Sequence, residues 1–280
     1  MTTTEQVIEV GALQWFYREA TPNYESEKPP VLLLHGLPSH SYIWRGLLPE
    51  LAEYGLRAIA PDWIGFGFSA KPDSRDFAYT PDAFEEALAN FLQALNLTKF
   101  SLIVQGFLGS VGLQYALEHQ EQIERLVILN TPLSKAAKLP WQMRQWGLPF
   151  IGDMLTQDPL LVDRTLEGGS GFVIADENLA AYRQPFLKSS AAGRALKATV
   201  KNLKLPEAMA KLASQSWENP TLLVWGMADP WLTPDEATRM ASSYLQVELL
   251  KLEEAKHYLQ EHWLKEISPA IINFLRRQVL

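Results

Sequence analysis

The chain has 280 residues, 47% of them hydrophobic and 20% charged, which predicts a folded globular protein of one large or two medium domains. It contains no cysteine, which excludes disulfides, thiolate catalysis and cysteine-based metal centres. The formal net charge is −7 with Lys and Arg scattered, so neither nucleic acid nor a membrane is an expected partner. No long apolar segment and no basic-then-apolar leader is present, so we expect a cytoplasmic protein; its oligomeric state stays open.

Short apolar runs alternate with helical patterns along much of the chain. A hairpin around Gly11 is predicted first, from residues 6–13 and 14–20. Further buried strands are expected at residues 30–36, 56–61, 100–105, 123–130, 221–226 and 246–252. Helices are expected at residues 42–54, 81–95, 109–119, 234–244 and 261–277. This alternation predicts an α/β fold with a mainly parallel sheet covered by helices on both faces.

The alternation stops between residues 132 and 218. This stretch has a helical pattern, is rich in Pro and Trp, and contains no convincing buried strand. We therefore predict a helical cap, residues 132–218, inserted into a core domain made of residues 1–131 and 219–280.

Motifs with special composition follow the predicted strands, at the sheet edge where ligands of open parallel sheets bind. They are H-G-L-P at 35–38, D-W-I-G-F-G-F-S at 62–69, Q-G-F-L-G at 105–109, G-M-A-D at 226–229 and H-Y-L-Q-E at 257–261. Together with A-Y-R-Q-P-F at 181–186, these motifs resemble the α/β-hydrolase superfamily, in the branch of haloalkane dehalogenases and epoxide hydrolases. The resemblance implies a mostly parallel eight-stranded sheet with a helical cap.

In that family the turn after the third buried strand carries the nucleophile, Ser in esterases and Asp in dehalogenases. Aligning V-Q-G-F-L-G with the dehalogenase pattern V-Q-D-W-G-G places Gly106 at the nucleophile position. Because glycine has no side chain, no covalent intermediate can form there. Ser110 is an alternative nucleophile, but it is expected in the first turn of the following helix, where Ser is usually a cap or packing residue.

The resemblance makes His257 the catalytic base and Asp229 the carboxylate that orients it. The alternative is that His257 is a hydrogen-bonded core histidine and Asp229 a helix cap. The backbone N–H groups of Leu37 and Phe107 are the expected oxyanion hole. Many dehalogenases have Asn and Trp at these two positions to hold halide, so dehalogenase activity is not expected.

Substrate contacts are expected from His35 and from cap residues Trp141, Trp146 and Tyr182, which suit a small hydrophobic ligand. The alternative for the cap aromatics is that they only pack the cap onto the core. No metal or cofactor is implied.

Two functions of different class remain open. One is an enzyme that uses His257 and Asp229 on water or on a substrate proton without a side-chain nucleophile. The other is a non-catalytic ligand-binding or receptor-like protein. A nucleophile-knockout variant of a dehalogenase- or epoxide hydrolase-like enzyme is a third reading, and the further departures at Phe107 and Leu108 argue against it.

Overall fold

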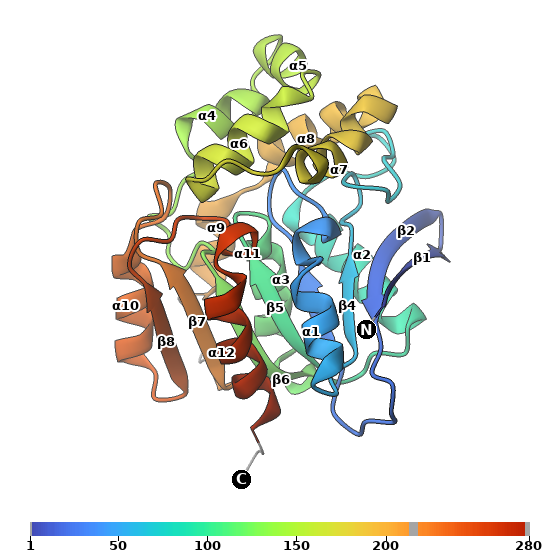
Figure 1. Ribbon diagram of the computed structural model, residues 1–280. Helices are drawn as coiled ribbons and strands as arrows, with labels where there is room; N and C mark the ends of the chain where they lie inside the picture. The colour runs from blue at the N-terminus through green and yellow to red at the C-terminus, as the bar shows by residue number, and fades with distance from the viewer. Residues whose placement is uncertain (1, 213–217, 278–280) are drawn as a thin grey trace.

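The protein is described here by a computed structural model that covers residues 2–212 and 218–277 (Figure 1). Its described strands form one eight-stranded sheet in the order β1-β2-β4-β3-β5-β6-β7-β8. β1 and β2 form an antiparallel hairpin, β2 pairs antiparallel with β4, and every later pairing is parallel. The strands are β1 Thr3–Val10, β2 Leu13–Ala20, β3 Val31–Leu34, β4 Ala58–Pro61, β5 Phe100–Gln105, β6 Ile123–Leu129, β7 Thr221–Gly226 and β8 Val247–Leu252. The predicted α/β class, with a mostly parallel sheet, is confirmed.

Helices cover both faces of the sheet, as two separate hydrophobic clusters require. α2 (Pro81–Ala94), α3 (Gly109–Glu118) and α10 (Pro234–Ser243) contribute to one cluster, and α1 (Leu47–Glu53) and α12 (Leu264–Arg276) to the other. In Figure 1, α1 and α12 lie in front of the sheet while α2 and α3 lie behind it. The central strands β3, β5 and β7 are buried at every position, as strands covered on both faces must be.

Two predicted helices are each broken into two elements. The helix expected at 42–54 is a 3₁₀ turn, η1 (Ser41–Trp44), followed by α1, with Arg45 and Gly46 between them. A Cβ atom on Gly46 would collide with the end of the Leu264 side chain at the start of α12, so a larger residue at this bend requires that side chain to move. The helix expected at 261–277 is α11 (Leu259–His262) and then α12, with Trp263 between them. A further 3₁₀ turn, η2 (Gln120–Gln122), leads into β6.

The described residues between β6 and β7 form helices and no strand. Most of them lie above the carboxyl edge of the sheet in Figure 1, where we call them the cap helices. They are α4 Trp141–Arg144, η3 Gln145–Gly147, α5 Ile151–Thr156, α6 Leu160–Ser170, α7 Asp176–Lys188, α8 Ser190–Asn202 and α9 Leu205–Leu212. α9 leads back toward the core and packs against α3. None of the helices described is both long and apolar enough to cross a membrane.

Candidate active site

The turn that follows β5 carries Gly106, the residue that the sequence aligns with a nucleophile position. Gly106 joins β5 to α3 and has a φ of +69°, a left-handed conformation that glycine adopts without strain. A Cβ atom at this residue would lie 3.3 Å from His257 Nε2 and 3.2 Å from Gly36 Cα. The turn therefore directs position 106 toward the ring of His257.

The loop after β3 packs against the same turn. Gly36 has no room for a side chain, because a Cβ atom there would lie 2.8 Å from Gln105 O and 3.1 Å from Gly106 Cα. Leu37 and Phe107 directly follow these two touching glycines. Among the described residues, neither of their backbone N–H groups has a hydrogen-bond acceptor. Both groups are therefore available to donate to a substrate oxygen.

His35 holds this loop in place through hydrogen bonds of both its ring nitrogens. Its Nε2 accepts a hydrogen bond from the Trp63 backbone N–H at 3.1 Å, and its Nδ1 lies 2.9 Å from Gly36 O. Because Nε2 accepts, Nδ1 carries the proton and donates to Gly36. Burial lowers the pKa of His35 to about 4, against the attraction of Asp62, so the ring is neutral near pH 7. Both ring nitrogens are used within the protein, which assigns His35 a role in shaping the loop.

His257 and Asp229 come together beyond the ends of β7 and β8. His257 Nδ1 lies 2.8 Å from Asp229 Oδ2, and both side chains are almost completely buried. The other carboxylate oxygen, Oδ1, accepts from the backbone N–H groups of Trp231 and Leu232 at 2.8 and 3.2 Å. Since an ionised carboxylate only accepts, Nδ1 donates and the lone pair of a neutral ring is left on Nε2.

Asn130, at the end of β6, is a second partner of the same carboxylate. Its Nδ2 donates to Asp229 Oδ2 at 2.6 Å, and its Oδ1 accepts from the Gly226 backbone N–H at 2.8 Å. The amide thus bridges the ends of two neighbouring parallel strands. It fixes Asp229 in the orientation that meets His257.

Three aromatic rings surround the imidazole. The ring of Phe107 stacks on His257 with centroids 5.4 Å apart, and Trp231 and Tyr258 lie at 4.8 and 4.9 Å. The Tyr258 hydroxyl donates to Leu37 O at 2.6 Å, which ties the loop after β3 to the histidine segment. His257 Nε2 is buried and has no hydrogen-bond partner among the described residues. An imidazole in these surroundings can take a proton from a molecule placed beside Gly106.

The end of α6 contacts the histidine segment directly. The His257 backbone N–H donates to Gly169 O at 2.8 Å. A Cβ atom on Gly169 would collide with the rings of Tyr258 and Trp231, so only glycine allows this close approach. The cap is therefore hydrogen-bonded to the residue that carries the base.

Ser110 and the two cap tryptophans have other surroundings. Ser110 lies in the first turn of α3, where its buried hydroxyl donates to Phe107 O at 2.7 Å. Trp141 is 64% exposed, with the Arg144 guanidinium carbon 5.4 Å from its ring centroid. Trp146 is buried in η3, which packs against α5 and α8. Contact of either tryptophan with a substrate stays a prediction.

Tyr182 of α7 links the cap to the segment after His257. Its hydroxyl donates to Glu261 and accepts from Arg45 at 3.2 Å. Arg45 also forms a two-pronged pair with Glu261, both N–O distances being 2.9 Å. Burial, together with the negative charge of Glu261, raises the pKa of Tyr182 far above its usual value, so the hydroxyl keeps its proton. A role for this hydroxyl on a substrate also stays a prediction.

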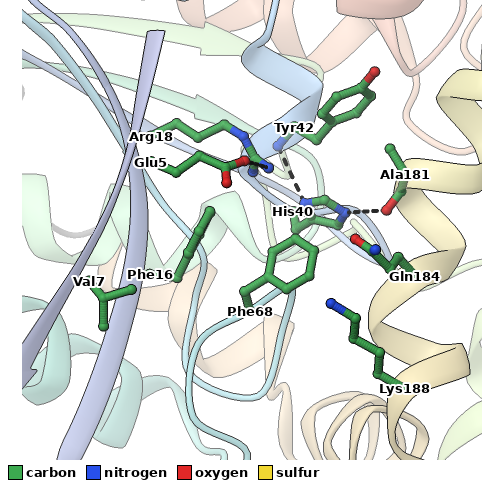
Figure 2. Close-up of a pocket in the computed structure, with 10 residues that line it drawn as sticks. All are labelled: Glu5, Val7, Phe16, Arg18, His40, Tyr42, Phe68, Ala181, Gln184 and Lys188. Carbon is green, nitrogen blue, oxygen red and sulfur yellow. Dashed lines mark hydrogen bonds and ion pairs between the residues drawn. The ribbon is translucent and has the colours of Figure 1, made fainter.

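A separate cavity of about 460 Å³ opens between the N-terminal hairpin and α7 (Figure 2). Arg18 lies in its wall and pairs with Glu5 at 2.8 Å. His40, at the back, receives a hydrogen bond from the Tyr42 N–H and donates to Ala181 O at 3.2 Å. Burial lowers the pKa of His40 to about 4, so this ring is also neutral near pH 7. Neither Gly106 nor His257 lines this cavity.

Comparison with known proteins identifies the fold family. The family described as alpha/beta hydrolase fold matches residues 29–262. This chain belongs to the α/β-hydrolase fold family. Haloalkane dehalogenase 2 of Mycobacterium tuberculosis is 29% identical over 258 residues, covering 89% of this chain and 88% of the relative.

Two further similar proteins widen that comparison. A cis-3-alkyl-4-alkyloxetan-2-one decarboxylase of Xanthomonas campestris is 28% identical over 281 residues, covering 91% of each chain. The haloalkane dehalogenase DbeA from Bradyrhizobium elkani shares the α/β-hydrolase fold, with a TM-score of 0.84 at 24% identity, covering 98% of each chain. The predicted resemblance to the dehalogenase-like branch of the α/β-hydrolases is confirmed.

Several residues around the α/β-hydrolase dyad were missed by sequence reasoning. Trp231 follows the G-M-A-D motif and Tyr258 lies within H-Y-L-Q-E, but no pattern showed that both rings enclose the imidazole. Asn130 is one of the strand-end residues that the sequence marks, but the sequence did not show that its amide holds Asp229. Gly169 sits in the run G-G-S-G at 168–171, where small residues signal a close approach of the backbone.

Proposed function

We propose that this α/β-hydrolase is an enzyme in which His257, oriented by Asp229, acts as a general base on a small hydrophobic molecule beneath the cap. The reaction forms no covalent bond to a side chain. One observation carries the proposal: the buried Nε2 of His257 has no partner among the described residues and faces position 106, which has no side chain. A family member with Ser or Asp at that position would direct its nucleophile at the same nitrogen.

The proposed step uses the groups around Gly106. His257 Nε2 takes a proton from water as its oxygen attacks the substrate, or takes a proton from the substrate itself. Asp229 stabilises the resulting imidazolium, and the Leu37 and Phe107 N–H groups hold the negative charge that develops on a substrate oxygen. The imidazolium then returns its proton to the leaving oxygen or to the product.

Dehalogenation is not proposed, although relatives carry that name. Position 106 offers no carboxylate to displace a halide, and the side chains of Leu37 and Phe107 have no N–H group to bind one.

Among the described residues, no group of three or more His, Asp and Glu side chains could hold a metal ion.

Turnover of a panel of apolar esters, epoxides and dialkyl oxetan-2-ones, followed by mass spectrometry, tests the proposal. The oxetan-2-ones are included because a similar protein is named as a decarboxylase of such compounds. Their strained ring makes the carbonyl reactive enough for direct attack by activated water. His257→Gln should lower the rate of an accepted substrate about 10²–10⁴-fold, since it removes the base. Asp229→Asn should lower it as well.

His262→Gln is the matched control, because His262 lies in the same segment but stacks on Phe172. It should leave the rate unchanged. A covalent adduct on the protein during turnover, or full activity of His257→Gln, would contradict the proposal. Tight binding of a panel member without turnover, unaffected by His257→Gln, would favour the ligand-binding alternative instead.

A further inference from the structure

Large apolar side chains are exposed together at one end of the cap. Four of them fall within seven residues, from just before α5 into its first turn; we call them the α5 tip: Leu148, Phe150, Ile151 and Met154. Phe150 is 88% exposed and Met154 69%. Figure 1 shows α5 at the top of the molecule, at the end remote from the sheet. A cluster of exposed apolar residues in such a place marks an interaction surface.

The backbone at Phe150 is strained in a way that folding does not explain. Its φ is +62° and its ψ −55°, and the Ile151 N–H donates to Pro149 O at 2.7 Å. This is a γ-turn with positive φ, a rare and strained conformation for a bulky residue. The exposed ring gains almost no packing within the chain in return. Such a combination is typical of a position kept for contact with something outside the protein.

Charge in the chain is unevenly divided between the cap and the core. Residues 132–218 hold 11 of the 25 Lys and Arg but only 8 of the 32 Asp and Glu, so the cap is net positive and the core carries all of the acidic excess. The net charge of −7, which predicts no membrane partner for the chain as a whole, hides this division. The cap that bears the α5 tip therefore has the opposite sign of net charge from the core.

Four cations on helices around the α5 tip are of two kinds. Lys197 and Arg164 each neutralise an acid of the same region, Asp153 and Asp158 respectively. Arg144 and Lys201, in contrast, have no carboxylate partner among the described residues; they line a shallow cavity of about 270 Å³ beside Leu148 and Trp141. A Trp ring and unpaired cations bordering an apolar tip match the headgroup level of a bilayer.

We propose that the cap docks on an anionic lipid bilayer. The α5 tip enters the boundary between headgroups and acyl chains, led by Phe150 and Met154. Arg144 and Lys201 face the lipid phosphates, and Trp141 lies at the headgroup level. The negative charge of the lipid headgroups repels the acidic core and keeps it away from the bilayer. This surface brings the cap to a membrane in which hydrophobic molecules dissolve, and it does not depend on the chemistry proposed at His257.

Flotation of the full chain with vesicles tests the proposal. The protein should bind vesicles of phosphatidylcholine mixed with phosphatidylglycerol more strongly than vesicles of phosphatidylcholine alone, and added salt should weaken the binding. Phe150→Gly should lower the partition coefficient about 10- to 100-fold, since a Phe side chain is no longer buried. The same variant should melt at a higher temperature, because glycine accepts positive φ.

Leu245→Ser is the matched control. Leu245 is fully exposed, but it precedes β8 and so lies at the sheet edge opposite the cap. Its replacement should leave vesicle binding unchanged. Absence of binding to either vesicle, equal binding to both, or wild-type binding by Phe150→Gly would overturn the proposal. So would a dimer in sedimentation that Phe150→Gly dissociates without any vesicle binding, since the α5 tip would then join two copies of the chain.

Discussion

Replacing Gly106 by Ser restores a hydroxyl at the position aligned with the nucleophile. The Cβ atom would lie 3.3 Å from His257 Nε2, so a rotamer that turns Oγ toward the ring brings it within about 2.6–3.2 Å of Nε2. Serine at a φ of +69° costs about 1–3 kcal/mol, and the 3.2 Å contact of Cβ with Gly36 Cα requires a small shift of the loop. The variant should fold and melt a few degrees lower.

The assay is hydrolysis of a small activated ester. General-base help typically contributes about 10²–10⁴-fold, and a misplacement of about 1 Å removes much of it, so Gly106→Ser should exceed the wild type by roughly ten-fold or more. Gly106→Ala is the matched control: it carries the same backbone strain without the hydroxyl, and should show no gain. If Gly106→Ser gains activity and the double variant with His257→Ala keeps that gain, the hydroxyl is not activated by His257. The assignment of position 106 would then be wrong.

Three further predictions concern stability, all measured by urea denaturation. The pKa of His35 and of His40 is lowered to about 4, so between about pH 4 and 6.5 the unfolded chain binds more protons than the folded one. The free energy of unfolding is therefore unaffected by protonation of these rings above pH 6.5 and falls by roughly 2–3 kcal/mol per ring as the pH is lowered toward 4. His40→Gln should make this decline less steep. A wild-type free energy of unfolding that does not change over this pH range would refute the burial argument. Glu261→Gln should destabilise the protein by about 2–4 kcal/mol, because it leaves Arg45 without its carboxylate. Tyr182→Phe should cost about 1 kcal/mol, and an activity loss without this cost would instead indicate a substrate contact of the hydroxyl.

The sheet could be predicted because its signal is local. Runs such as V-L-L-L at Val31–Leu34 and F-S-L-I-V-Q at Phe100–Gln105 are buried on both faces, and apolar continuity over that length is typical of parallel strands. Helix breaks were not predicted. At the bend, Gly46 packs against Leu264, which lies more than two hundred residues further along the chain and reaches it only after folding.

Around the site, the sequence identified the residues at the strand ends. It did not predict the contacts that the cap helices make with them. Asp229 and His257 stand in motifs after strands, and parallel topology brings such positions to one edge. The Gly169 contact with the His257 backbone comes from a cap helix, and the G-G-S-G run signals a close approach there without showing which segment approaches. The same is true of Tyr182, whose sequence position does not show that its hydroxyl meets Glu261.

In the proposed function, His257 is a base that faces Gly106. A crystal structure of the protein with an apolar ester or ketone bound tests this most directly. We predict a water or ligand oxygen within about 2.6–3.2 Å of His257 Nε2, with Nδ1 still bonded to Asp229. A ring turned away from Asp229, an Nε2 bonded to an acceptor of the protein itself, or the side chain of Phe107 or Trp231 filling that space would contradict the prediction.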